Sequence, residues 1–450
     1  MATPLQCSCG LSSDHSDVMQ GRCRPFRCHS MATTALLSLY LVLTGCVGDQ
    51  TEKHEAMDRA ETDFEFVNTG ALWEAGEEWM VTDTIVRLGV ISGDAPFLFS
   101  NVLGAVRLST GRIVVLDGHS SELRAFSSDE EHEWSAGGPG RGPGEFTSPK
   151  SLMRLKDDHL QVEDELARVI FDADGQLVTH SVLEWARIVD AGTFSSECRP
   201  VPKFLDNHVL LAACDSDVSE VREMGPWRME TTLVRTTWSL DRFDTIGVFL
   251  REDAWAVPAS TGTVYMPGIM GETGIMAVGG HPPRLVFLRT LDYRLEVFDL
   301  VAPIPERVRI IERSDSARLR APSRAELDDA WTSWDARAER SHLLFGNRRD
   351  LDAVRRQIVP PDSISVASGV FVDDLNVIWV NHRAEPLDTT GSALWGVFSE
   401  SGRFLGEVAL PSNLTPHQIA EDFIVGVLHD EFQVEYVVVL ALERSDSRPT

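Results

Sequence analysis

Residues 137–146 read Gly-Gly-Pro-Gly-Arg-Gly-Pro-Gly-Glu-Phe, a run that suits neither a helix nor a regular strand. Its five glycines accept positive φ without steric cost. Pro139 and Pro143 restrict φ and remove two backbone donors. A shaped, exposed loop is therefore expected here. The short strand patterns on both sides make it the connection between two repeated β units.

Downstream of this loop the chain has the pattern of one propeller blade. Short apolar runs predict four strands, at residues 151–155, 159–164, 167–171 and 176–182. Four strands in roughly forty residues is the size of a blade. Upstream, Gly111–Asp117 and Glu122–Phe126 predict a hairpin, so the loop follows the first full unit.

The same order of strands recurs and predicts a closed ring. Three further units are expected, at about residues 207–249, 274–311 and 370–410. The last unit joins the chain ends, because Phe423–Leu428 and Glu435–Leu440 form only a hairpin and Val81–Ile91 is a lone strand. A shared blade removes two open sheet edges. The predicted fold class is all-β, a six-bladed β-propeller.

A helical insertion is expected at about residues 316–360. Ser323 and Glu326 have capping-box spacing, and Leu327, Trp331, Trp334 and Ala338 recur at helical spacing. A second helix is expected over 351–358, before Pro360 and Pro361. The insertion packs against its host as a structural lid, or it forms a flap that faces a ligand.

The amino terminus predicts export and lipid attachment. Ala32–Leu43 is too short to span a bilayer and suits a signal-peptide core. It ends in Leu43-Thr44-Gly45-Cys46, which resembles the lipobox of bacterial lipoproteins and implies lipidation of Cys46. The alternative is an ordinary secretory signal that contains a cysteine. The predicted domains are a signal peptide (1–45), a flexible tether (46–69), the propeller (70–443) and a disordered tail (444–450).

Charge and cysteine content limit the partners. With 41 basic and 69 acidic residues the net charge is −28, which argues against nucleic acid. The expected partners are the membrane, through the lipid anchor only, and an unidentified protein, peptide or glycan. The protein is expected to be a monomer. In an exported body Cys198 and Cys214 could form a disulfide, or they could be two small buried apolar residues.

A family resemblance rests on three stretches. Gly138–Phe146, the preceding Glu122–Phe126, and Gly426–Glu431 near the end resemble bacterial six-bladed β-propeller lipoproteins related to NHL-repeat proteins. The resemblance covers about Leu72 to Leu442. It implies a propeller in the bacterial cell envelope, facing the periplasm or the exterior, and it implies no defined reaction.

The sequence contains no recognisable catalytic signature and predicts no cofactor. The glycine-rich run lacks the Lys-Ser or Lys-Thr of a phosphate loop, and Glu145 would repel phosphate. Asp172–Gly175 lacks the glutamate that completes a calcium loop, so a hairpin turn is expected. Single surface or turn residues are expected at His119, His132, His159 and His429.

Asp117, Asp164 and Asp373 fall at similar ends of second-strand patterns and admit two interpretations. They could line a central channel and hold a metal ion, or each could accept backbone N–H groups in its own turn, which the recurrence favours. Two functions follow. A lipid-anchored binding or scaffold module is preferred, and the alternative is a metal-assisted, lactonase-like hydrolase with a site at the axial channel.

Overall fold

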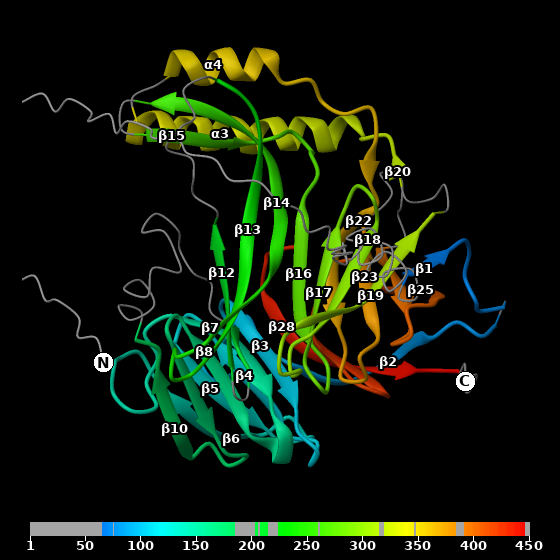
Figure 1. Cartoon of the computed structure of the whole chain (residues 1–450). Helices are drawn as coiled ribbons and strands as arrows, with labels where there is room; N and C mark the ends of the chain where they lie inside the picture. Colours follow the sequence, from blue (N-terminus) through cyan, green and yellow to red (C-terminus); the bar gives the residue numbers. More distant parts are fainter. Residues whose placement is uncertain are drawn as a thin grey trace, which may run out of the picture. The chain divides into compact units, whose positions relative to one another are not determined.

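Each repeated unit folds as a small antiparallel sheet, because its strands are short, joined by tight turns and adjacent in the chain. The computed structural model describes residues 65–74, 76–184, 203–205, 208–214, 224–259, 262–314, 319–345, 348–383 and 391–445, all within one unit, Ala56–Thr450. In this part of the chain, six four- or five-stranded sheets follow one another as blades 1 to 6 (Figure 1).

The first three blades come before the middle of the chain. Blade 1 contains β3 (Val102–Arg107), β4 (Ile113–Asp117), β5 (Glu122–Phe126) and β6 (His132–Gly137). Blade 2 contains β7 (Pro149–Arg154), β8 (Leu160–Asp164), β9 (Ala167–Phe171) and β10 (Leu177–Val182). Blade 3 contains β11 (Lys203–Phe204), β12 (His208–Cys214), β13 (Gly225–Thr237), β14 (Phe243–Ala259) and β15 (Gly262–Pro267).

The last three blades complete the ring. Blade 4 contains β16 (Gly274–Gly279), β17 (Arg284–Arg289), β18 (Arg294–Asp299), β19 (Glu306–Arg313) and the early strand β1 (Glu65–Asn68). Blade 5 contains β22 (Ala367–Val372), β23 (Ile378–His382), β24 (Ser392–Phe398) and β25 (Phe404–Pro411). Blade 6 contains β26 (Leu414–Ile419), β27 (Phe423–His429), β28 (Glu435–Glu443) and β2 (Met80–Leu88).

Ring closure occurs in blade 6 as predicted. β2 pairs antiparallel with β28, from Met80 opposite Glu443 to Leu88 opposite Val437. The first strand of this blade, β26, was not predicted from the sequence. Its Pro416 and Gln418 flank a bulge. Proline and a bulge interrupt the alternation by which a strand is recognised.

The core lies between the blades. An apolar cluster fills each interface between neighbours, including the one between blades 6 and 1. The sequence of β4 is a continuous apolar run because both of its faces are packed. Ile113 and Val115 pack toward blade 6, whereas Val114 and Leu116 pack toward blade 2. Successive side chains point to opposite faces of a strand, so a blade packed on both faces needs apolar residues at every position. The chain is therefore a closed six-bladed β-propeller.

Two faces of the propeller follow from the strand order. We call the first the connection face, because it carries the blade-to-blade connections, such as residues 138–148, and the turns between second and third strands, such as residues 118–121. The opposite face carries the turns between first and second strands, such as residues 108–112.

The predicted insertion is helical and lies on blade 3. It contains α3 (Arg324–Phe345) and α4 (Arg348–Gln357), and β20 (Leu319–Arg320) pairs with β21 (Ile364–Ser365) at its base. β13 and β14 extend beyond the other strands of their blade and carry β15 and both helices (Figure 1). Trp334 and Val354 are buried against Met266 and Ile269. This packing agrees with the structural-lid interpretation.

The capping box of α3 forms as predicted. The Ser323 hydroxyl accepts the Glu326 N–H (3.2 Å), and the Glu326 carboxylate accepts the Ser323 N–H (2.9 Å). The Arg320 guanidinium donates to both oxygens of Glu326 (2.8 and 2.6 Å), and this contact lowers the pKa of Glu326 to about 2.

Both predicted ends of the propeller need correction. The tether was expected to reach residue 69, but β1 pairs in parallel with β19. Asn68 donates to the Gly402 carbonyl of blade 5 (3.0 Å), so this segment joins two blades. The tail was expected to begin at 444, but Arg444 donates to Asp373 (2.8 Å) and Ser445 donates to Glu77. Local sequence patterns do not predict these contacts, because the two residues that form each contact are far apart in the chain.

Candidate functional site

Asp117 and Asp164 occupy equivalent positions, at the ends of the second strands of blades 1 and 2. Asp117 accepts the Ser100 N–H (2.9 Å), and Asp164 accepts the Thr147 N–H (3.0 Å). Both are buried, with exposed fractions of 1% and 4%. In each blade the carboxylate therefore holds the backbone that leads into the first strand. Both side chains make the backbone hydrogen bonds of the turn interpretation.

Asp373 does not share that position, which corrects the prediction. It follows β22, in the turn between first and second strands, and so lies on the face opposite to Asp117 and Asp164. Its Oδ1 accepts the N–H groups of Leu375 (2.9 Å) and Val377 (2.8 Å). The sequence pattern predicted that Asp373 lies at the end of a second strand, whereas in the structure it follows the first strand of blade 5. The three carboxylates do not converge.

The glycine-proline loop is folded onto itself. The Phe146 N–H donates to the Gly138 carbonyl (2.9 Å), and the Gly140 N–H donates to the Phe146 carbonyl (3.0 Å). Glu145 turns inward and accepts the Gly142 N–H (2.7 Å), while Phe146 is buried in the interface between blades 1 and 2. Gly137 has φ of +95°, and a Cβ there would lie 2.5 Å from the Phe146 ring. The loop is a hydrogen-bonded connection between blades 1 and 2, and its rigidity remains a prediction.

Replacement of Pro139 and Pro143 by alanine is expected to keep the fold and to lower its stability slightly. Proline restricts the unfolded chain, so each change should cost about 0.4–1 kcal/mol in the free energy of unfolding. Urea unfolding followed by circular dichroism measures this. Complete loss of folding in the double variant would contradict a purely local role.

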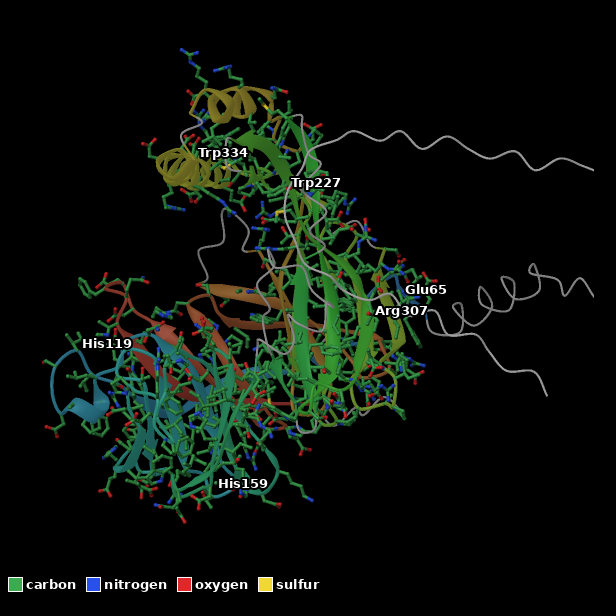
Figure 2. The ribbon with its side chains drawn as sticks, turned by 60° about the vertical axis from the view of Figure 1, so that its left-hand side comes forward. Glu65, His119, His159, Trp227, Arg307 and Trp334 are labelled. Carbon is green, nitrogen blue, oxygen red and sulfur yellow. The ribbon has the colours of Figure 1, made fainter. Side chains whose placement is uncertain are left out.

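The other predicted positions are turn or surface residues. Asp172 accepts the N–H groups of Asp174 (3.0 Å) and Gln176 (2.8 Å), which confirms the hairpin turn. His119 and His159 lie far apart, on blades 1 and 2 (Figure 2). Cys46 and Cys198 lie outside the described residues, and so does the side chain of Cys214, so the lipidation and the disulfide remain predictions.

A buried polar cluster lies between blades 4 and 5, and the sequence analysis did not predict it. The Tyr293 hydroxyl lies 2.7 Å from His382 Nε2, and His382 Nδ1 lies 3.4 Å from Glu407. Arg313 also reaches Glu407 (3.4 Å), and contact with His382 and Arg313 lowers the pKa of Glu407. Tyr293 is fully buried and the Glu407 side chain is 34% exposed, so this cluster joins the two blades and reaches the surface only at its Glu407 end. Its members are far apart in sequence and carry no common spacing.

A crevice with a volume of about 670 Å³ lies between blades 3 and 4. On the blade 3 side it is lined by the consecutive residues Ile246–Leu250 of β14. Its floor contains three phenyl rings: the centroid of Phe249 lies 4.6 Å from that of Phe287 and 5.4 Å from that of Phe298. This volume lies within the usual range for ligand sites.

Charged side chains line both ends of the crevice. Toward the connection face, Arg228 and Arg289 donate to opposite oxygens of the buried Glu272 (3.0 and 3.3 Å). Toward the opposite face, Arg307 donates to Glu296 (3.1 Å). Arg307 lies near Glu65 on the outer side of blade 4 (Figure 2). The crevice thus has an apolar middle between two polar ends, which suits an elongated amphipathic ligand.

The described ranges contain neither a cluster of metal ligands nor a membrane-spanning helix. No group of three His, Cys, Asp or Glu side chains that could hold a metal ion occurs there. No helix among those residues is long and apolar enough to cross a membrane.

The order of the sheets, their closed ring and the packing between all neighbouring blades define the class of this protein as a six-bladed β-propeller. No family model and no curated protein matches the sequence. Solved structures with a similar fold include a Bacteroides fragilis protein (14% identity, 85% of this chain and 99% of that chain covered, TM-score 0.41). They also include a member of the DUF4221 family from Bacteroides vulgatus (10%, 81% and 98%, 0.43) and a gluconolactonase from Xanthomonas campestris (10%, 77% and 87%, 0.36). These TM-scores are below 0.5, so the assignment rests on the sheets themselves.

Proposed function

We propose that the protein is a lipid-anchored binding module of the bacterial cell envelope whose ligand occupies the crevice between blades 3 and 4. The observation that carries this proposal is the crevice itself, with a phenyl floor, charged ends and a volume of about 670 Å³. The carboxylates considered for an axial metal instead hold turns on two different faces. A binding function therefore has better support than the axial hydrolase.

Substitution of Val248 by glutamate is expected to weaken ligand binding at the crevice. Val248 lines the crevice and is 53% exposed, so the change should leave the fold intact. Anilinonaphthalene sulfonate, which combines an aromatic body with an anionic group, is a suitable fluorescent probe. The parent should bind it saturably, and the variant about tenfold more weakly, because a carboxylate on the strand edge that borders the crevice repels the sulfonate and keeps this edge hydrated.

Val301 offers a matched control. It is also a valine, is 51% exposed, and lies in the turn between β18 and β19, outside the crevice lining. Val301→Glu should bind the probe as the parent does. Equal binding by the parent and both variants would show that the crevice does not take the probe.

Replacement of Cys46 by serine tests the anchor. Serine lacks the thiol that receives the lipid, so the variant should move from the membrane fraction to the soluble fraction. The measurement is cell fractionation followed by immunoblotting. An unchanged membrane fraction would contradict the proposed anchoring, and it would leave the binding proposal standing.

A further inference from the structure

The crevice opens onto the edge of a strand. In a strand, alternate side chains point to opposite faces, so a cavity on one face is lined by every second residue. Here five consecutive residues of β14, Ile246–Leu250, line the same cavity. Such a set lines a cavity that lies along the strand edge, where backbone N–H and C=O groups are presented.

That edge of β14 has no strand partner in the part of the chain that the structure describes. One edge pairs with β13 along Phe243–Ala256. The other pairs with β15 only from Ala254 onward, and a bridge joins Glu252 to Thr273. None of the described strands pairs with the second side of residues 246–251. Register shifts at Ile246 and Arg251 flank its centre, and bulges often occur beside functional sites.

The extent of the open edge is limited on the connection-face side. The Leu250 carbonyl approaches blade 4 so closely that a Cβ on Gly274 would lie 1.8 Å from its oxygen. Below this point the blades diverge, and Phe287, Phe298 and Ile310 of blade 4 line the crevice across from β14. One wall of the crevice is therefore the edge of β14, and the other is the apolar sheet face of blade 4.

Another blade of the same propeller already accepts an added strand. β1 pairs with the outer strand β19 of blade 4, although β1 ends at Asn68 and blade 4 begins only at Gly274. An extended segment can therefore complete an outer edge of this fold. Unpaired edges attract such segments because each added residue satisfies backbone donors and acceptors.

We propose that the ligand of the crevice is an extended peptide segment of a partner protein, which adds to the open edge of β14 as a further strand. The segment has apolar side chains at alternate central positions, which contact the phenyl floor, and polar residues at its ends near Arg289 and Arg307. About five residues can pair along Ile246–Leu250, a length of about 17 Å. This inference rests on the proposed binding function of the crevice.

Fluorescence anisotropy with a labelled heptapeptide of alternating valine and threonine tests the inference on the full-length protein. Two further peptides carry N-methyl groups, one at the odd and one at the even residues. In a paired strand the N–H groups of alternate residues point to the same side. One N-methylated peptide should therefore bind at least about tenfold more weakly, and the other should bind within about threefold of the parent peptide. Val248→Glu should abolish binding, and Val301→Glu should not.

The outcomes separate this inference from the proposed function. Strand addition at β14 is wrong if both N-methylated peptides bind with equal affinity, or if Val248→Glu does not weaken binding of the unmodified peptide. If no peptide binds but anilinonaphthalene sulfonate still binds in a manner that depends on Val248, the crevice is a binding site for another class of ligand. If neither probe binds, both proposals fail.

Discussion

Truncation of the chain after Glu431 is expected to prevent the propeller from folding. The truncation removes β28, which pairs with β27 on one side and β2 on the other. Val437, Val438 and Val439 are fully buried, and they contribute to the interfaces of blade 6 with both neighbours. Without β28 the ring has an opened blade, and the edges of β27 and β2 are free to pair with other molecules.

Solubility and circular dichroism on heating measure this effect. The truncated protein should accumulate in the insoluble fraction or melt without a cooperative transition. A matched truncation after Ser445 removes only the last five residues of the chain and should melt like the parent. A soluble, cooperatively melting protein that ends at Glu431 would refute the structural role of ring closure.

Substitution of Arg444 by methionine is expected to cause a large loss of stability, although Arg444 lies outside the sheets. The Arg444 guanidinium donates to Asp373 (2.8 Å) and lies 4.3 Å from the ring centroid of Trp79. The Asp373 side chain has no exposed surface, so its carboxylate would stay buried without a cation. Breaking one partner of a buried ion pair costs about 3–5 kcal/mol.

Arg355 provides a control in which burial is the main difference. It donates to Asp335 (2.6 and 3.0 Å) and lies 4.4 Å from the ring centroid of Trp331. Both charged side chains are nearly half exposed, at 42% and 49%. Arg355→Met should therefore cost about 1 kcal/mol or less. Similar losses in the two variants by urea unfolding would contradict the importance of burial.

Acid is expected to reduce the effect of Arg444→Met. Burial raises the pKa of Asp373, and the bonds from Arg444 and Trp379 oppose this rise. In the variant the opposing cation is gone, so the folded protein holds a proton on Asp373 more tightly than the unfolded chain does. Stability should therefore increase as the pH falls through this raised pKa toward the ordinary pKa of an aspartate, where the unfolded chain also takes up the proton. Adding Asp373→Asn should restore part of the lost stability at pH 7; no recovery would show that the carboxylate is not the cause.

Much of the fold is predictable because blades are local structures. The strands of units 4 and 5 were expected close to where they lie, since each pairs with its neighbour in the chain. The pairing of Val81–Ile91 with the last hairpin was inferred from incomplete units at the two ends. β26 was missed because a proline and a bulge obscure its pattern. β1 was missed because a four-residue strand carries too short a pattern to identify.

The candidate site was not predictable. The residues of the crevice belong to β13, β14, β17, β18 and β19, and each of its phenylalanines is indistinguishable in sequence from an ordinary core residue. Only the divergence of blades 3 and 4 turns part of this core into a cavity. Similarly, Asp117 and Asp373 follow comparable apolar runs, and only the strand order shows that they lie on different faces.

By itself, the sequence determined the β repeat, the number of blades, the capping box and the position of the connection at Gly137–Phe146, because turn chemistry and strand periodicity act over a few residues. It also carries the expected lipidation signal at Cys46. The tertiary structure alone decided the partner of Asp373, the buried position of Arg444 and the open edge of β14. These features join residues that are distant along the chain, and their distances depend on how six sheets pack around the ring.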